Sequence, residues 1–308
     1  MSTPASEAPS LSGSRPSSIM LACGLAAALV IWAVNYIVAT VALAHLDLLT
    51  LIAFRFEIAG AVMLGIYLAR GRRTPLQRRH LGTFIWLAFL GVIVNQGLFT
   101  TGLKYSIPAH SAIIVAFDPI LILVLARAMG IETLSAGKIG GMGLALAGIL
   151  LLEFEQGRHT HSPLLMGDLI TLGGALGFSI YAVLAKRVTA DYDAVALNTF
   201  NCAGGAIVFL PVAVHQAIRL DWRAVAWQGW AGMLYMAIFS SVAAYLIFYW
   251  ALRHMDPSRV AVINYLQPVI VILLASAVLA EHPSSHLLTG TALVLAGVYL
   301  AERGARII

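Results

Sequence analysis

The stretch LKYSIPAHSAIIVAFDPILILVLARAMGIETLSAGKIGGMGLALAGILLLE, which covers Leu103–Glu153, recurs as LRHMDPSRVAVINYLQPVIVILLASAVLAEHPSSHLLTGTALVLAGVYLAE, which covers Leu252–Glu302. The two copies align without a gap at an offset of 149, and seventeen of the 51 positions are identical. Both copies are long and apolar, as in membrane proteins. A membrane chain that contains the same unit twice is typical of secondary transporters.

Upstream of this stretch the repeat continues at an offset of 145, which places Tyr36 on Tyr181 and Gly60 on Gly205. Apolar residues form 60% of the chain and charged residues only 11%, against roughly 25% charged residues in soluble domains. Apolar runs long enough for membrane helices follow one another along the chain. We count ten: Ile19–Leu43, Leu48–Ala69, Leu81–Gly102, Ser111–Met129, Gly137–Leu152, Gly167–Ala185, Ala194–Val214, Gly229–Leu252, Val260–Ala280 and Leu287–Ala301.

The predicted fold is therefore an all-α membrane protein with ten transmembrane helices, arranged as two inverted five-helix repeats. An odd number of spans in each copy makes the second copy enter the membrane upside down. We expect a disordered cytoplasmic tail over residues 1–18, a first repeat over 19–153 and a second repeat over 164–303. In such proteins the substrate site lies near the middle of the membrane between the repeats, and alternating access follows from their exchange of conformation.

The basic residues fix the expected orientation. With both termini in the cytoplasm, fourteen Lys and Arg residues fall on the cytoplasmic side and four on the other. This asymmetry is the positive-inside pattern, so the net charge of +5 needs no nucleic-acid partner. The lipid bilayer is the expected partner, and the expected location is a bacterial inner membrane crossed many times.

Two matched dipeptides stand out inside the spans: Asp118-Pro119 in the fourth run and Gln267-Pro268 in the ninth. Proline removes a backbone hydrogen bond, so Pro119 and Pro268 predict kinks that act as hinges or line a cavity. Asp118 is a costly group at this depth. It could be a proton site, a contact for a substrate ammonium, or a neutral or paired carboxylate that holds the kink.

A set of polar and aromatic residues recurs in the first, third, fourth, sixth, eighth and ninth runs, while the fifth and tenth runs carry almost none. The latter two are therefore expected to be peripheral supports. Several members of the set share one helix face at spacings of three or four residues. Together they predict a mostly uncharged, amide-rich and aromatic cavity for small amphipathic substrates. The candidate substrate-binding residues are Trp32, Asn35, Tyr36, Asn95, Gln96, Phe99, Asp118, Ser179, Tyr181, Tyr245, Tyr249, Asn264 and Gln267.

Two further charged residues, Arg55 and Glu57, lie in the outer half of the second run. They do not face each other on a helix. We expect Arg55 to extend outward toward the membrane surface, or else to touch substrate. We expect Glu57 to pair with a neighbouring helix, or else to have a role in proton transfer.

The repeat ends resemble the drug/metabolite transporter superfamily, in its ten-span EamA-type branch. The resemblance covers nearly the whole chain from Ile19, and its most specific features are the paired Leu-x-Leu-Ala-Gly ends at Gly148 and Gly297. Within that branch the chain is similar to the YddG-type exporters of aromatic and other neutral amino acids. The resemblance implies an inner-membrane exporter of amino acids and related small metabolites, with a central cavity.

Other readings follow from the same residues. Nucleotide sugars, sugar phosphates or drugs are alternative substrates, although anionic substrates favour a cavity with more cations. An intramembrane enzyme is disfavoured, because Asp118 is matched by Gln267 and no span offers a zinc-binding or serine-activating histidine. We predict no catalytic residue, metal or cofactor. Glycines at helix-packing spacing favour contacts within a monomer over a dimer.

Overall fold

The protein is described by a computed structural model covering residues 16–71, 73–130, 135–156, 163–279 and 284–305. This described part contains helices and no strand. In the first half these are α1 (Ser18–Leu43), α2 (Leu48–Ala69), η1 (Arg78–His80), α3 (Leu81–Ala88), η2 (Phe89–Gly97), α4 (Leu98–Tyr105), α5 (Pro108–Val115), α6 (Asp118–Ala128) and α7 (Ala136–Gln156). In the second half they are α8 (Pro163–Val188), α9 (Ala194–Arg219), α10 (Trp227–Tyr235), η3 (Met236–Ala244), α11 (Tyr245–His254), α12 (Pro257–Ala261), η4 (Val262–Leu266), α13 (Gln267–Val278) and α14 (Ser285–Ala305).

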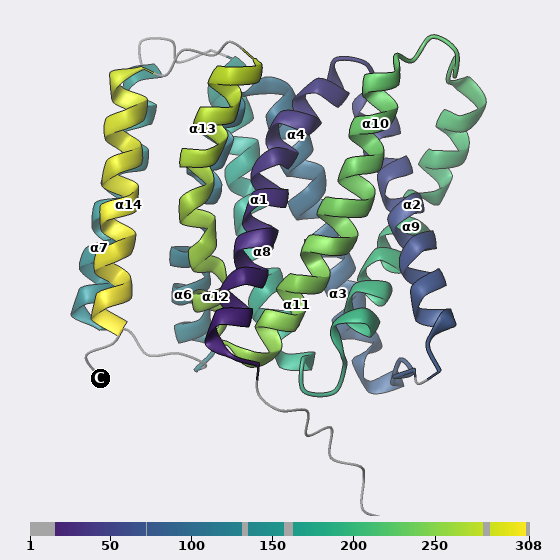
Figure 1. Cartoon of the computed structure of the whole chain (residues 1–308), viewed down its shortest axis with the longest axis horizontal. Coiled ribbons are helices and arrows are strands. Elements are labelled where there is room, and N and C mark those ends of the chain that lie inside the picture. Colours follow the sequence, from purple (N-terminus) through teal and green to yellow (C-terminus); the bar gives the residue numbers. More distant parts are fainter. Residues whose placement is uncertain (1–15, 72, 131–134, 157–162, 280–283, 306–308) are drawn as a thin grey trace, which may run out of the picture.

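Among the described residues, eight helical stretches, several of them made of consecutive helical segments, are long and apolar enough to cross a membrane. They correspond to the first four and the sixth to ninth predicted runs. The fifth and tenth runs form α7 and α14, which are 21 residues long each but do not belong to these eight. The two helices pack on each other and form a pair at one edge of the bundle (Figure 1). Glu132 and Glu281, which the offset of 149 places on each other, lie outside the described residues, as does most of the predicted tail.

The third and eighth stretches each contain a π-helical segment at a matching place, η2 and η3. A π-helix adds a residue to each turn and is frequent at functional sites. The extra residue rotates the side chains that follow it relative to an α-helix. The paired segments therefore change which residues of these two stretches face the centre of the protein.

The matched prolines produce breaks rather than kinks within continuous helices. α5 ends at Val115 and α6 restarts at Asp118, with Pro119 in its first turn. In the second half, the 3-10 segment η4 is followed by α13, with Pro268 in its first turn. Proline is well tolerated there because the N–H it lacks has no partner within the helix. The expected disturbance of the helix is therefore present, whereas movement about these prolines stays a prediction.

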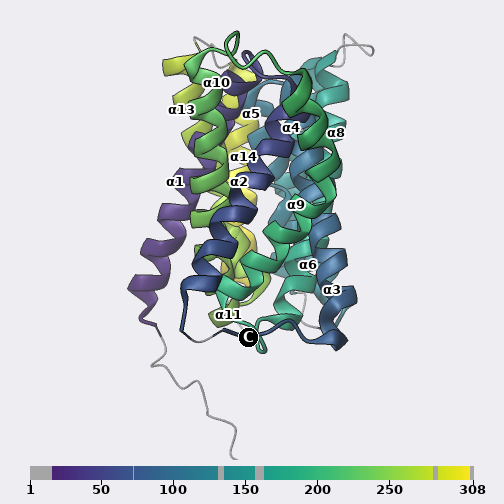
Figure 2. The ribbon, with the colours of Figure 1, turned by 90° about the vertical axis from the view of Figure 1, so that its right-hand side faces the viewer.

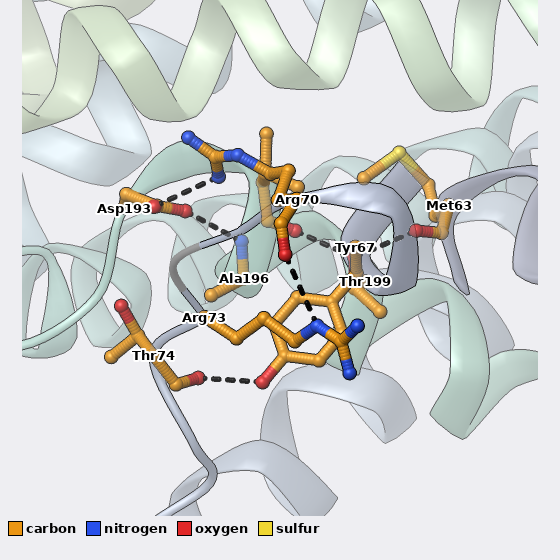
Figure 3. A network of polar contacts seen from close by, with 9 residues as sticks. Met63, Tyr67, Arg70, Arg73, Thr74, Asp193, Ala196 and Thr199 are labelled. Atoms are coloured by element: carbon orange, nitrogen blue, oxygen red, sulfur yellow. Dashed lines mark hydrogen bonds and ion pairs between the residues drawn. The ribbon is translucent and has the colours of Figure 1, made fainter. Parts of the chain in front are cut away.

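α2 and α9 are joined at both ends by contacts that mirror each other. Asp47 precedes α2 and its Oδ1 accepts a hydrogen bond from Nε2 of Gln216, in the last turn of α9, at 2.9 Å. Asp193 precedes α9 and its Oδ2 pairs with Nη1 of Arg70, which follows α2, also at 2.9 Å (Figure 3). The start of each helix thus lies at the end of the other, so α2 and α9 are antiparallel. Both pairs obey an offset of 146, one residue more than the offset predicted for this region.

α7 and α14 also contact each other reciprocally. A Cβ added at Gly148 would lie 2.7 Å from the carbonyl oxygen of Gly290, and one added at Gly297 would lie 2.5 Å from that of Gly141. Gly148 and Gly297 are equivalent in the repeat, and so are Gly141 and Gly290. Small residues let the two backbones approach closely here. The glycines of these helices thus serve packing within the chain.

α1 begins and α14 ends at the same end of the bundle (Figures 1 and 2). α2 also ends there, and its last turns carry the polar network of Figure 3, in which the Tyr67 hydroxyl donates to the carbonyl of Thr74 at 2.9 Å. The basic residues between α2 and α3 lie at this end. The described chain therefore begins and ends at the same end of the bundle as the basic residues between α2 and α3 (Figure 1).

Candidate functional site

A cavity lies in the bundle among residues from both halves of the chain. With the space at its mouth it has an empty volume of about 450 Å³. Ten of the thirteen predicted site residues line it. The lining consists of Trp32, Asn35, Tyr36, Asn95, Gln96, Phe99, Val115, Asp118, Phe178, Ser240, Tyr245, Asn264 and Gln267. None of its described lining residues comes from α7 or α14, the two helices expected to be peripheral.

One chain of hydrogen bonds crosses the cavity wall from α1 to α6. The Tyr36 hydroxyl donates to Oε1 of Gln267 at 3.1 Å, and Nε2 of Gln267 donates to Oδ1 of Asn264 at 3.0 Å. Nδ2 of Asn264 in turn lies 3.4 Å from Oδ2 of Asp118. The chain links the two helix breaks, because Asp118 and Gln267 are the first residues of α6 and α13.

A second polar group joins η2 to α11. Nε2 of Gln96 donates to the Tyr245 hydroxyl at 3.0 Å and to Oδ1 of Asn95 at 2.9 Å. Nδ2 of Asn95 donates to the carbonyl of Gly174 at 3.1 Å, which connects the group to α8. Adjacent residues Asn95 and Gln96 both line the cavity at the end of the π-helical segment.

Two acceptor atoms in the wall have no hydrogen-bond partner in the described part of the chain. They are Oδ1 of Asp118 and Oδ1 of Asn35. Both side chains are buried, at 2% and 4% exposure. A buried polar atom without a partner is costly, so each is a place where a donor from a ligand would be stabilised. The cavity is therefore prepared to accept hydrogen bonds from a bound molecule.

Aromatic rings make up much of the remaining wall. Tyr36 and Phe99 meet edge to face, with ring centroids 5.0 Å apart, and Trp32 meets Tyr245 at 5.7 Å in a similar way. Such pairs hold each other in place and present apolar faces to the space between them. The site thus combines fixed rings with amide and carboxylate oxygens, a chemistry suited to a small amphipathic molecule.

Three predicted residues do not line the cavity. Tyr181 is fully buried against Gly91, and its hydroxyl bonds to the hydroxyl of Tyr249. Ser179 donates to the carbonyl of Ala175 at 2.9 Å, one turn earlier in α8. The face of α8 that meets the cavity is instead that of Phe178. These polar groups have partners within the protein, and the three residues do not line this cavity, contrary to expectation.

Val115, Phe178 and Ser240 line the cavity but were not predicted. Val115 and Phe178 are apolar and cannot be distinguished by type from other apolar residues in a span. Ser240 lies inside η3, where the π-helical turn changes the spacing that an α-helix would impose. No α-helical pattern in the sequence would have found it.

Arg55 does not extend toward the membrane surface as expected. Its side chain is 1% exposed, and its Nε donates to Oγ of Ser241 in η3 at 2.8 Å. The guanidinium group of Arg55 therefore lies in the interior of the bundle. Oε1 of Glu57 has no hydrogen-bond partner among the described residues, so the expected pairing with a neighbouring helix is not seen for that atom.

Three comparisons place these features among known proteins. The sequence profile of the EamA-like transporter family matches the chain twice, over residues 19–154 and 165–302. The chain is 28% identical to the uncharacterized transporter YyaM of Bacillus subtilis over 258 residues, covering 83% of this chain and 84% of YyaM. It is 27% identical to an uncharacterized transporter of Archaeoglobus fulgidus, covering 90% of this chain and 95% of that one.

The inner membrane transporter YedA of Escherichia coli is also similar, at 25% identity over 82% of this chain and 80% of its own. A solved crystal structure superimposes with a TM-score of 0.70, covering 94% of this chain and 99% of the other at 21% identity, which shows a shared fold. The apolar helices make this a multi-pass membrane protein. With the family profile matched over most of its length, the chain belongs to the EamA-like transporter family, whose members are membrane transporters of the drug/metabolite class.

Proposed function

We propose that this protein exports neutral amino acids, aromatic ones in particular, and related small metabolites across an inner membrane by alternating access. It does so as a ten-span transporter built from two inverted five-helix repeats, with both termini in the cytoplasm. The main support for the proposal is the cavity, which is lined by residues from both halves of the chain and by aromatic rings. Two buried acceptor atoms in its wall have no hydrogen-bond partner among the described residues. No cofactor or metal is needed for this function.

The reciprocal contacts support an inverted arrangement. When residue i meets residue j of the other copy, and their equivalents meet in the same way, the two copies are related by a two-fold axis. Asp47 with Gln216 and Asp193 with Arg70 form such a set. Because α2 and α9 are antiparallel, the axis runs across the helices, and therefore in the plane of the membrane. Two copies related in this way can exchange conformations, which is the basis of alternating access.

The distribution of charge supports the orientation. The end of the bundle at which α1 begins and α14 ends carries the basic segment between α2 and α3 (Figure 1). Cytoplasmic loops carry an excess of Lys and Arg, so this end is assigned to the cytoplasm. The relative YedA, an inner membrane transporter, agrees with the membrane chosen.

Amino acids are favoured over anionic substrates by the lining. Asp118 is the acidic residue of the cavity wall, whereas no Lys or Arg is found among the described residues that line it. Nucleotide sugars and sugar phosphates carry several negative charges, which this wall would repel. The aromatic side chains favour substrates with an apolar or aromatic portion.

Counterflow in proteoliposomes tests the proposal. The purified full-length protein is reconstituted in vesicles loaded with unlabelled phenylalanine, and the uptake of labelled phenylalanine is followed. The expected result is transient accumulation above equilibrium, which a panel of neutral amino acids in the outer medium suppresses. A nucleotide sugar and a sugar phosphate should neither exchange nor compete. Exchange of either anionic compound in place of phenylalanine would assign the protein to another substrate class.

A further inference from the structure

Arg55 is a buried cation without a carboxylate partner in the described structure. It is the largest of the fully buried side chains there, and no acidic group lies within 4.0 Å of its nitrogens. Its contacts are neutral: Nε donates to Ser241 Oγ at 2.8 Å and Nη2 to Ser240 Oγ at 3.4 Å. Its Nη1 has no partner at all in the described residues. The guanidinium also lies over the Phe56 ring, 5.5 Å from its centroid. A buried charge compensated only by hydroxyls and an aromatic ring is costly, which indicates a role beyond packing.

Arg55 reaches the cavity through one side chain. Ser240, which accepts the longer of the two hydrogen bonds, lines the cavity, whereas Ser241 does not. A rotation of the Ser240 side chain would open the guanidinium edge that carries Nη1 and Nη2 toward the bound molecule. That edge offers two parallel N–H donors, the geometry that binds a carboxylate through both of its oxygens.

The acceptor groups of the cavity belong to other helices. Oδ1 of Asp118 comes from α6 and Oδ1 of Asn35 from α1, while Arg55 comes from α2 and Ser240 from η3. Asp118 and Arg55 form no ion pair within the described part of the chain. The site thus keeps a negative group and a positive group apart from each other. An α-amino acid carries an ammonium and a carboxylate, the complementary pair.

We propose that Arg55 binds the carboxylate of the transported amino acid, with Ser240 as the movable group between them, while Asp118 and Asn35 receive the ammonium. This assignment rests on the proposed function and sharpens it, since it names the two charged groups a substrate must carry. If Arg55 only held the π-helical segment η3 in place, its loss would weaken every ligand alike.

Equilibrium binding to the purified full-length protein in nanodiscs separates these roles. Three probes are used: L-phenylalanine, L-phenylalaninamide, which lacks the carboxylate, and 3-phenylpropionate, which lacks the ammonium. Arg55→Gln should weaken the binding of phenylalanine and 3-phenylpropionate at least tenfold and leave that of the amide within twofold. Arg55→Lys keeps the charge but loses the two-donor edge, so it should weaken the same two probes by a smaller factor. Arg78→Gln, an exposed change outside the cavity, is the matched control and should alter none of them.

Equal weakening of all three probes, or unchanged binding of both carboxylates, would overturn the assignment, as would a wild-type protein that binds neither carboxylate. Arg55→Lys keeps the test decisive if Arg55→Gln does not fold. The counterflow experiment is read separately. If both Arg55 variants transported phenylalanine as well as the wild type, the proposed function would hold, but Arg55 would have no part in it. If binding of 3-phenylpropionate depended on Arg55 but phenylalanine was not transported, Arg55 would be a carboxylate-binding residue and the proposed function would be wrong.

Discussion

Gln96 and Tyr245 hydrogen-bond to each other, Nε2 to hydroxyl at 3.0 Å, although 149 residues separate them in the chain. That separation equals the offset of 149 that holds from Leu103 onward, and Gln96 lies only seven residues before Leu103. If this offset is extended to them, the two residues are equivalents in the repeat. Two equivalent side chains can touch only close to the axis that relates the copies. The cavity they line is therefore centred where the halves meet.

Removing the Tyr245 hydroxyl tests its part in the cavity. Tyr245→Phe loses the hydrogen bond with Gln96 and should lower the apparent affinity for phenylalanine several-fold, corresponding to about 1 kcal/mol for one hydrogen bond. Competition in counterflow measures this. Tyr249→Phe is the matched control: it also loses a tyrosine hydroxyl bond, but outside the cavity, and should leave the affinity unchanged. Equal effects of the two variants would mean that neither acts on substrate.

Neutralising Asp118 tests the ammonium contact. Asp118→Asn can still accept from Asn264, so the fold should hold, but it loses the charge at the unpaired oxygen. Hydrogen bonds to charged groups contribute about 1.5–3 kcal/mol, so the affinity for phenylalanine should fall at least tenfold while 3-phenylpropionate binds as before. Unchanged phenylalanine affinity would remove Asp118 from the binding site.

Energy coupling is tested with the same variant. A substrate gradient alone drives facilitated export, so we expect an imposed pH gradient to leave the initial rate of wild-type transport unchanged. Uptake into vesicles with and without the gradient measures this. A rate that responds to the gradient in the wild type and not in Asp118→Asn would instead make Asp118 a proton carrier.

The orientation is tested by cysteine labelling in intact cells. In a background with Cys23 and Cys202 replaced by Ala, a membrane-impermeant maleimide added outside should modify Arg223→Cys and spare Arg78→Cys. Both positions are exposed in the structure, so access depends on the side of the membrane. Permeabilised cells, in which both cysteines react, serve as the control. The reverse pattern in intact cells would invert the assigned topology.

The cap that Asp193 provides at the start of α9 should stabilise the antiparallel pair of α2 and α9. Asp193→Ala loses the ion pair and also the hydrogen bond by which Oδ1 caps α9 through the N–H of Ala196, at 2.8 Å. The loss of a cap costs about 1 kcal/mol and the partly exposed ion pair adds at most about 1 kcal/mol. Thermal unfolding in detergent should therefore show a lower midpoint for Asp193→Ala than for Asp193→Asn, which keeps the cap. Equal midpoints would mean that the cap contributes nothing.

Much of the site was accessible from the sequence because polar side chains are rare in apolar spans. Asn264 and Gln267 are informative for that reason: a buried amide in a membrane helix needs a partner, and the repeat indicated where partners would converge. Tyr181 shows the limit of this reasoning, since a polar group satisfied by the next helix looks the same in sequence as one that lines a cavity.

The rest depended on geometry that residue type does not encode. Ser240 lines the cavity because η3 is π-helical, and nothing in its neighbours distinguishes that turn from an α-helical one. Arg55 was expected to extend toward the membrane surface because arginines near a membrane surface usually do. Its burial follows from the two serine hydroxyls that η3 turns toward it. The helix breaks, by contrast, were marked by Pro119 and Pro268.

One cavity between two inverted halves is proposed to open alternately to the two sides of the membrane. Val115 lines that cavity, and Val115→Cys introduces a thiol of similar size in the cysteine-free background. An impermeant maleimide should modify this cysteine both in right-side-out and in inside-out vesicles, and phenylalanine should slow the reaction from both sides. Labelling from one side only, in every condition including saturating substrate, would contradict alternating access through this cavity.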